Sequence, residues 1–102
     1  MNGATRNNST GRVLSFEQKG DFFYKRGNDK LDKNDLIEAL CSYRRAMEQE
    51  PEDQYSCIAV AEVLSGMERY DDSNRVLLPL LSREDVEPEA IFGLGCNLAA
   101  LN

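Results

Sequence analysis

The sequence predicts an all-α fold in which about five antiparallel helices form a helix-turn-helix repeat solenoid. Apolar residues recur at spacings of three and four, as on one face of an α-helix, and no segment alternates with the period of two that a strand needs. The chain also matches itself at an offset of 34 residues. With 102 residues, 41% of them hydrophobic and 29% charged, it is long enough for one domain with a modest core.

The N-terminal segment differs from the rest of the chain. Residues 1–14 are rich in Asn, Gly, Ser and Thr, so they bury too little apolar surface to offset the entropy of ordering, and we expect a flexible tail. Ser15 and Gln18 have the spacing of a capping box, which predicts that the first helix begins there and runs over residues 15–31. The folded domain should therefore span residues 15–102.

Four further helices follow from apolar stripes and prolines. Pro51 separates the second helix from the third, Pro79 predicts a kink in the fourth, and Pro88 opens the fifth. The predicted ranges are 35–49, 53–66, 71–82 and 88–101. In chain order, the stripes are Leu36, Leu40, Tyr43 and Met47; Cys57, Val60, Ala61 and Leu64; Tyr70, Ser73, Leu77 and Leu80; and Ile91, Leu94, Leu98 and Leu101.

Composition narrows the possible functions. The sequence contains no histidine, which removes Ser-His and Cys-His nucleophiles and His-ligated metal sites. We therefore expect neither an enzyme nor a cofactor, although a site built from Cys96, Glu62 and Asn28 stays open as an alternative. Three cysteines without C-x-x-C spacing, and no signal peptide, predict a reducing, cytoplasmic setting rather than a disulfide framework.

Charge and hydropathy exclude two classes of partner. A net charge of −6 works against binding to nucleic acid or to anionic lipid. The longest apolar run, residues 76–81, is far shorter than the roughly 20 residues that span a bilayer, so we expect no membrane segment. The charge is uneven, at +3 over residues 1–45 and −9 over residues 46–102.

The 34-residue offset places small residues on small ones. Gly27 aligns with Ala61 and Gly95, and Tyr43 aligns with Leu77, so both helices of a pair are repeated. Small side chains at such positions allow one helix to approach its neighbour closely. The repeats span residues 20–53 and 54–87, with a partial third over residues 88–102.

This pattern resembles the tetratricopeptide repeat (TPR) family. The first repeat fills six of eight signature positions, with Phe23, Gly27, Ala39, Tyr43, Ala46 and Pro51. Arg26 and Lys30 depart from the family preference, and such polar residues suit a terminal repeat. Over residues 20–102 the resemblance implies a right-handed superhelix whose concave face, built from the first helix of each repeat, binds other proteins.

The resemblance also nominates a binding groove. The concave positions hold Tyr24, Asn28, Tyr55, Ile58, Ala59, Glu62, Phe92 and Cys96. This lining predicts a protein-interaction module for an amphipathic helix or an extended apolar peptide, with a structural self-assembly module as the alternative. One subset of the family clamps the carboxylate of chaperone tails, but the clamp positions here hold Tyr24, Asn28, Ala59, Glu89 and Gly93. Only Asn28 matches, so we expect no binding of chaperone tails.

The last predicted helix is apolar on every side. Residues 88–102 contain a single charge, Glu89. If Ile91, Leu94 and Leu98 pack on the fourth helix, Phe92 and Leu101 remain in water, which is unusual for a terminal helix. We therefore expect the natural protein to continue past Asn102 into further repeats, and this chain to form a homodimer through the helix.

Overall fold

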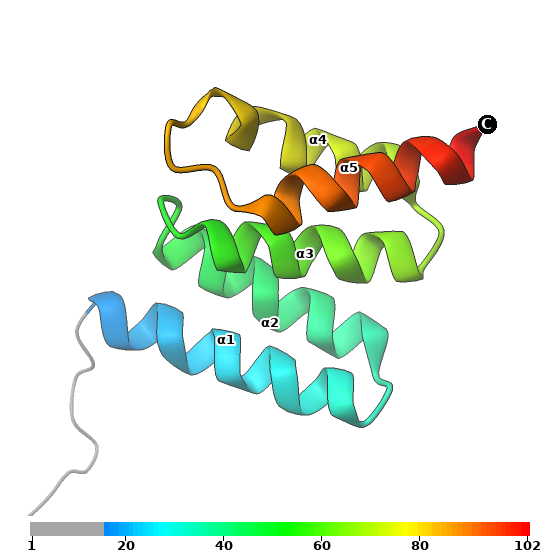
Figure 1. Cartoon of the computed structure of the whole chain (residues 1–102). Coiled ribbons are helices and arrows are strands. Elements are labelled where there is room, and N and C mark those ends of the chain that lie inside the picture. The colour runs from blue at the N-terminus through cyan, green and yellow to red at the C-terminus, as the bar shows by residue number, and fades with distance from the viewer. Residues whose placement is uncertain (1–15) are drawn as a thin grey trace, which may run out of the picture.

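The computed structural model describes residues 16–102, and within that range the chain is helical without a strand (Figure 1). The elements are α1 (Phe16–Asp32), α2 (Leu36–Gln49), α3 (Gln54–Gly66), α4 (Tyr70–Leu77), the 3₁₀ helix η1 (Leu78–Ser82) and α5 (Pro88–Leu101). The all-α class and the five predicted helices are thus confirmed. The expected tail and the expected cap at Ser15 lie outside the described residues.

Successive helices run antiparallel and pack as a stack, with α1 at one end and the α4–α5 pair at the other (Figure 1). Helix α3 lies at the centre, because it contacts α2 on one side and both α4 and α5 on the other. In residues 16–102 no helix is both long and apolar enough to cross a membrane.

Local signals at the turns agree with the predicted boundaries. The Asp35 side chain accepts a hydrogen bond from the Glu38 N–H, and Asp53 caps α3 by accepting from the Tyr55 N–H at 3.1 Å. Asn34 and Glu68 adopt left-handed φ angles of 59° and 63°, which reverse the chain after α1 and α3. The turns are therefore fixed by polar residues rather than by glycine.

Pro79 changes the type of helix. The predicted helix over residues 71–82 ends as an α-helix at Leu77 and continues as η1. Proline has no N–H to donate, and its ring collides with the carbonyl oxygen four residues earlier, so the α-helical ladder cannot pass through it. The expected kink is thus a switch to 3₁₀ geometry.

The core consists of two clusters that share α3. The stripes predicted for α2 and α3 face inward, with Tyr43 and Leu64 almost fully buried. The first cluster joins α2 and α3 through Ala39, Leu40, Tyr43, Ala59, Val60, Val63 and Leu64. The second joins α3 to α4, η1 and α5 through Cys57, Ile58, Ala61, Leu77, Leu80, Ala90 and Leu94.

Helix α1 is attached through a close approach at Gly27. A Cβ atom on Gly27 would lie 2.5 Å from carbons of the Tyr43 ring, so only glycine fits there. The Tyr43 hydroxyl donates a hydrogen bond to the side-chain oxygen of Asn28, and the Tyr24 ring lies 5.6 Å from the Tyr43 ring. Burial raises the pKa of Tyr43 to about 12.

The packing face of α5 is not the predicted one. The buried residues are Ala90, Leu94 and Asn97, whereas Ile91 and Leu98 are 54% and 58% exposed. The prediction that Ile91 and Leu98 pack on α4 is wrong. Small Ala90 brings the helix close to its neighbours, and Asn97 is held by hydrogen bonds there, so this rotation replaces an aliphatic contact by polar ones.

The predicted close approach at Gly95 is also wrong. No atom lies within 4 Å of a Cβ placed on Gly95, whereas one placed on Gly93 would lie 3.1 Å from the Leu77 side chain. Gly27 is covered by the helix that follows α1. Within residues 16–102 no element packs on the Gly95 position of α5, so this position is open.

Candidate functional site

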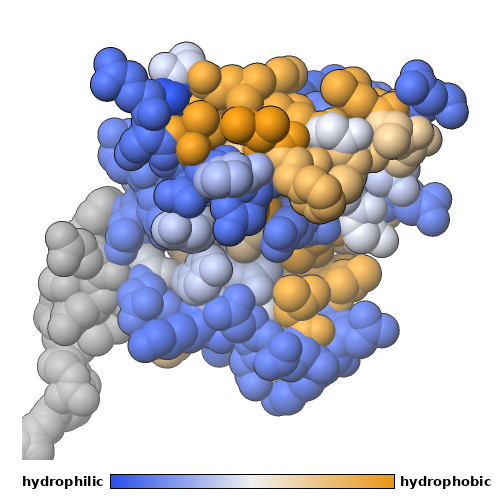
Figure 2. All heavy atoms as spheres, in the orientation of Figure 1, coloured by the Kyte–Doolittle hydropathy of each residue, from blue (hydrophilic) through white to orange (hydrophobic). Residues whose placement is uncertain are grey.

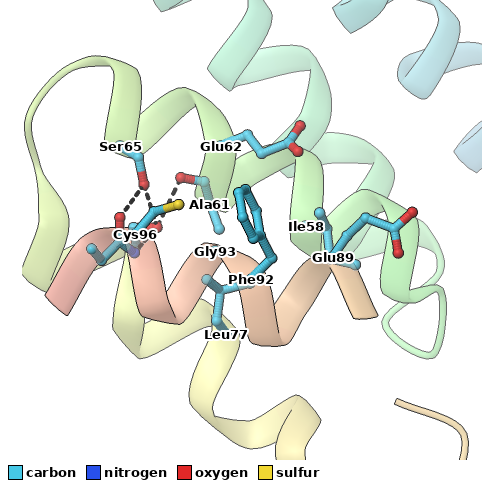
Figure 3. Close-up of a pocket in the computed structure, with 11 residues that line it drawn as sticks. Ile58, Ala61, Glu62, Ser65, Leu77, Glu89, Phe92, Gly93 and Cys96 are labelled. Carbon is cyan, nitrogen blue, oxygen red and sulfur yellow. Dashed lines mark hydrogen bonds between the residues drawn. The ribbon is translucent and has the colours of Figure 1, made fainter. Parts of the chain in front are cut away.

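A hollow of about 210 Å³ lies between α3 and α5, and α4 forms part of its floor (Figure 3). We call it the α3–α5 hollow. Its lining combines apolar, small polar and acidic side chains, namely Ile58, Ala61, Glu62, Ser65, Ser73, Leu77, Glu89, Phe92, Gly93, Cys96 and Asn97.

One end of the α3–α5 hollow rests on a buried hydrogen-bond network. Asn97 donates from Nδ2 to Ser73 Oγ at 2.9 Å and to Asn74 Oδ1 at 2.8 Å. Ser65 Oγ donates to Asn97 Oδ1 at 2.7 Å, and Ser73 Oγ donates to the Ala61 carbonyl oxygen at 2.8 Å. Since these polar groups satisfy one another, the network holds α3, α4 and α5 together.

The apolar part of the hollow has a buried floor and an exposed edge. Ile58 and Leu77 are 5% and 2% exposed, whereas the Phe92 side chain is 74% exposed. Figure 3 shows the Phe92 ring rising from α5 toward α3, between Glu62 and Ile58. An aromatic ring is thus presented to solvent beside a concave apolar surface.

Two carboxylates line the same hollow as that ring. Glu62 comes from α3 and Glu89 from the first turn of α5. Within the described part of the chain, neither carboxylate forms an ion pair. Partial burial, and then the negative charge of Glu89, raise the pKa of Glu62. The hollow therefore holds uncompensated negative charge.

A second hollow, of about 370 Å³, lies where the start of α1 faces the α2–α3 turn. It is lined by Asp21, Tyr24, Glu50, Asp53 and Tyr55. The charge of Glu87, with its hydrogen bond to the Tyr55 hydroxyl, raises the pKa of Tyr55. This hollow is also acidic and aromatic.

The loop before α5 is anchored on the start of α3. Gln54 is buried, donates from Nε2 to the Asp85 carbonyl oxygen at 2.8 Å, and accepts from the Glu87 N–H at 2.9 Å. Arg83 donates to the Glu52 carbonyl oxygen at 3.0 Å. These bonds fix where α5 begins, and hence where Glu89 lies relative to α3.

The structure divides the predicted groove residues between the two hollows. Ile58, Glu62, Phe92 and Cys96 come together in the α3–α5 hollow, and Tyr24 and Tyr55 line the second. Asn28 lines neither and holds the Tyr43 hydroxyl instead.

The remaining predicted groove residue, Ala59, is only 6% exposed. The expectation that Ala59 lines the groove is therefore corrected. It belongs to the α2–α3 cluster, against which Tyr24 of α1 packs. Sequence reasoning also missed the roles of Ser65 and Asn97, and their only signal was a polar residue in an otherwise apolar helix.

The arrangement gives little support to the alternative catalytic set. Cys96 and Glu62 line the same hollow, but Asn28 does not. Cys41, Cys57 and Cys96 are unpaired thiols, and burial raises the pKa of Cys57. Across residues 16–102 no group of three or more Cys, Asp or Glu side chains is placed to hold a metal ion.

Comparisons of the chain with protein-family models, with curated proteins and with solved structures give no match.

Proposed function

We propose that the protein is an interaction module of the tetratricopeptide-repeat type, which binds a peptide or helix of a partner protein in the α3–α5 hollow. The observation that carries this proposal is Phe92, 74% exposed beside an apolar floor of Ile58 and Leu77. Concave apolar sites with an exposed aromatic anchor are where binding energy concentrates in protein interfaces.

The arrangement of helices supports the repeat interpretation. The pairs α1–α2 and α3–α4 are both antiparallel, and Gly27 and Ala61, which share a repeat position, are both buried. Both hollows take side chains from first helices of the repeats: Tyr24 from α1, Tyr55 from α3 and Phe92 from α5. We propose that the module works in the reducing cytoplasm, which suits its unpaired thiols.

A peptide selection tests the function without a known partner. A phage-displayed library of random 16-residue peptides is selected on the wild-type chain and counter-selected on the Phe92→Ala variant. We expect Phe92→Ala to weaken the best peptide by about tenfold or more, the usual size of an aromatic anchor. Ile37→Ala on α2 is the matched control, because Ile37 is 66% exposed and lies outside both hollows.

Tyr55→Ala extends the test to the second hollow, where we expect a loss of at least about fivefold for peptides long enough to reach it. Circular dichroism of each variant checks that the fold is retained. Selected peptides that bind Phe92→Ala and Tyr55→Ala as tightly as the wild type would show that binding does not occur in these hollows.

A second candidate function is self-assembly through the outer face of α5. Ile91, Leu98 and Leu101 are about half exposed on α5, and Leu78 and Leu81 are exposed on η1. Figure 2 shows hydrophobic side chains gathered over α4 and α5, whereas the surface over α1 is largely hydrophilic. Contiguous apolar surface of this kind marks interaction sites.

Sedimentation velocity over a wide concentration range distinguishes this candidate. Self-assembly predicts a concentration-dependent dimer that Ile91→Gln/Leu98→Gln dissociates while Phe92→Ala leaves it intact. A monomer at the highest concentration, with little binding of a hydrophobic dye, would exclude the self-assembly function.

A further inference from the structure

The charges around the α3–α5 hollow define the chemistry of its partner more closely. We propose that the hollow binds a basic amphipathic segment of another protein, with an apolar side chain beside Phe92 and a lysine or arginine between Glu62 and Glu89. This inference rests on the proposed interaction function.

The two carboxylates of the hollow come from different helices. Glu62 lies on α3 and Glu89 on α5, and their carboxylate ends lie on the same side of the Phe92 ring (Figure 3). A side chain that packs on this side of the ring therefore reaches two negative charges. A long basic side chain fits this path, because its aliphatic stem packs on the aromatic ring while its charged end reaches the carboxylates.

Carboxylates elsewhere on the molecule pair with arginine side chains. Asp72 pairs with Arg69 at 2.7 Å and with Arg75 at 2.9 Å, and Asp85 pairs with Arg83 at 3.0 Å. Glu62 and Glu89 have no such partner within residues 16–102. Their mutual repulsion leaves a place for a cation from outside the chain.

The loss of water around Glu62 also favours a cation in the hollow. The raised pKa of Glu62 reflects burial first and the charge of Glu89 second, so its ionised form has lost water without gaining a counter-ion. A bound ammonium or guanidinium group would supply that counter-ion. Binding would thus relieve an unfavourable interaction of the free protein, in addition to burying the apolar surface of Phe92 and Ile58.

A second copy of this chain is a poor occupant by the same charge argument. Residues 16–102 contain ten basic and eighteen acidic side chains, a net charge of −8, so net charge disfavours a second copy in this acidic hollow. The segment before residue 16 carries two basic residues, Arg6 and Arg12, and no acidic one. Its occupation of the hollow is therefore an outcome that the experiment must detect.

Three fluorescein-labelled helical peptides test the inference by fluorescence anisotropy. All have the same leucine positions on one face, and the other face carries lysine, glutamine or glutamate. We expect the lysine peptide to bind the wild-type chain about tenfold more tightly than the glutamine peptide, since each charged contact is worth about that much when partly desolvated. The glutamate peptide should show no measurable binding.

Two charge-matched variants locate the effect. Glu62→Gln/Glu89→Gln should reduce the preference for lysine over glutamine at least fivefold. Glu38→Gln/Glu48→Gln removes the same charge from α2, outside the hollow, and should change the preference less than twofold. Thermal melts followed by circular dichroism show whether each variant stays folded.

The outcomes separate this inference from the function on which it rests. Equal binding of the lysine and glutamine peptides, with both weakened by Phe92→Ala, would overturn the basic partner and keep the interaction module. Peptide binding that Phe92→Ala leaves unchanged would overturn both. An increase of more than fivefold in affinity for the lysine peptide on Arg6→Gln/Arg12→Gln would assign the hollow to the chain's own N-terminal arginines and overturn the partner.

Discussion

Helices α1 and α5 occupy equivalent places in the repeat pattern and are attached in different ways. In α1, Gly27 lies against the Tyr43 ring, and the helix is held by close contact with α2. In α5, the equivalent Gly95 faces open space, and Asn97 anchors the helix through hydrogen bonds to Ser73 and Asn74. The comparison shows that two glycines aligned by the 34-residue offset play different roles, because only Gly27 has a neighbouring side chain packed against it.

The outer surfaces of α1 and α5 also differ, because α1 exposes charged side chains and α5 exposes apolar ones. Helix α1 carries an exposed ion pair of Lys25 with Asp21 at 3.1 Å, and Asp29 near its end pairs with Lys33, just after the helix, at 3.2 Å. Helix α5 exposes Ile91 and Leu98 on its outer face and Phe92 and Glu89 at the hollow. Charged pairs keep α1 in solvent, whereas the apolar surface of α5 is available for contacts with another molecule.

The largest expected effect comes from the polar anchor of α5. Asn97→Ala removes the hydrogen bonds to Ser73 and Asn74 and leaves buried polar groups without partners, so we expect a loss of about 2–4 kcal/mol in the free energy of unfolding. Urea unfolding followed by circular dichroism measures it, with Asn102→Ala at the end of α5 as a control. A loss below about 1 kcal/mol would mean that the network does not hold the helix.

Smaller changes in stability, of opposite sign, are expected at Gly27 and Gly95, the two glycines that the 34-residue offset aligns. Gly27→Ala places a methyl group against the buried Tyr43 ring, so we expect a loss of about 1–3 kcal/mol despite the better helix propensity of alanine. Gly95→Ala meets no atom and gains propensity, so we expect a gain of up to about 1 kcal/mol. Thermal unfolding of both variants measures these two changes in stability. Changes of the same sign would contradict the difference between α1 and α5.

The smallest expected effect concerns the charge beside α5. Because the pKa of Glu62 is raised in the folded protein, its contribution to stability is present below its ordinary value of 4.5 and is lost as the pH rises through the raised pKa. Glu62→Gln should therefore stabilise the free protein at pH 7, by no more than about 0.5 kcal/mol because solvent screens the repulsion.

Melting temperatures at pH 7 and pH 4 check this prediction, since the advantage of Glu62→Gln over the wild type should shrink at the lower pH. Glu48→Gln on α2 serves as the control. A variant that melts below the wild type at pH 7 would show that Glu62 stabilises the free protein, which the charge arrangement does not allow.

The sequence predicted the helices and their ends well, because proline and aspartate act locally. Asp35 and Asp53 cap the helices they precede, and Pro79 ends α4 within two residues of itself. The inward faces of α2 and α3 were also predicted, since both helices are covered on two sides and their stripes must be buried.

The orientation of α5 and half of the candidate site were not predictable from periodicity. Helix α5 is apolar all round, so no stripe indicates which side packs, and hydrogen bonds to Asn97 decide it. The grouping of Ile58, Glu62, Phe92 and Cys96 came from the repeat pattern, and in the structure these four residues line one hollow. The burial of Ala59 depends on its contacts across helices, which sequence spacing alone does not reveal.

The most direct test of the account is an NMR titration of the ¹⁵N-labelled chain with the lysine peptide. The account predicts saturable shifts of amides on the inner sides of α3 and α5, including those of Ile58, Glu62 and Phe92, with little change at Ile37 on α2. Shifts confined to the outer face of α5, around Ile91 and Leu98, or an unchanged spectrum at saturating peptide, would contradict binding in the α3–α5 hollow.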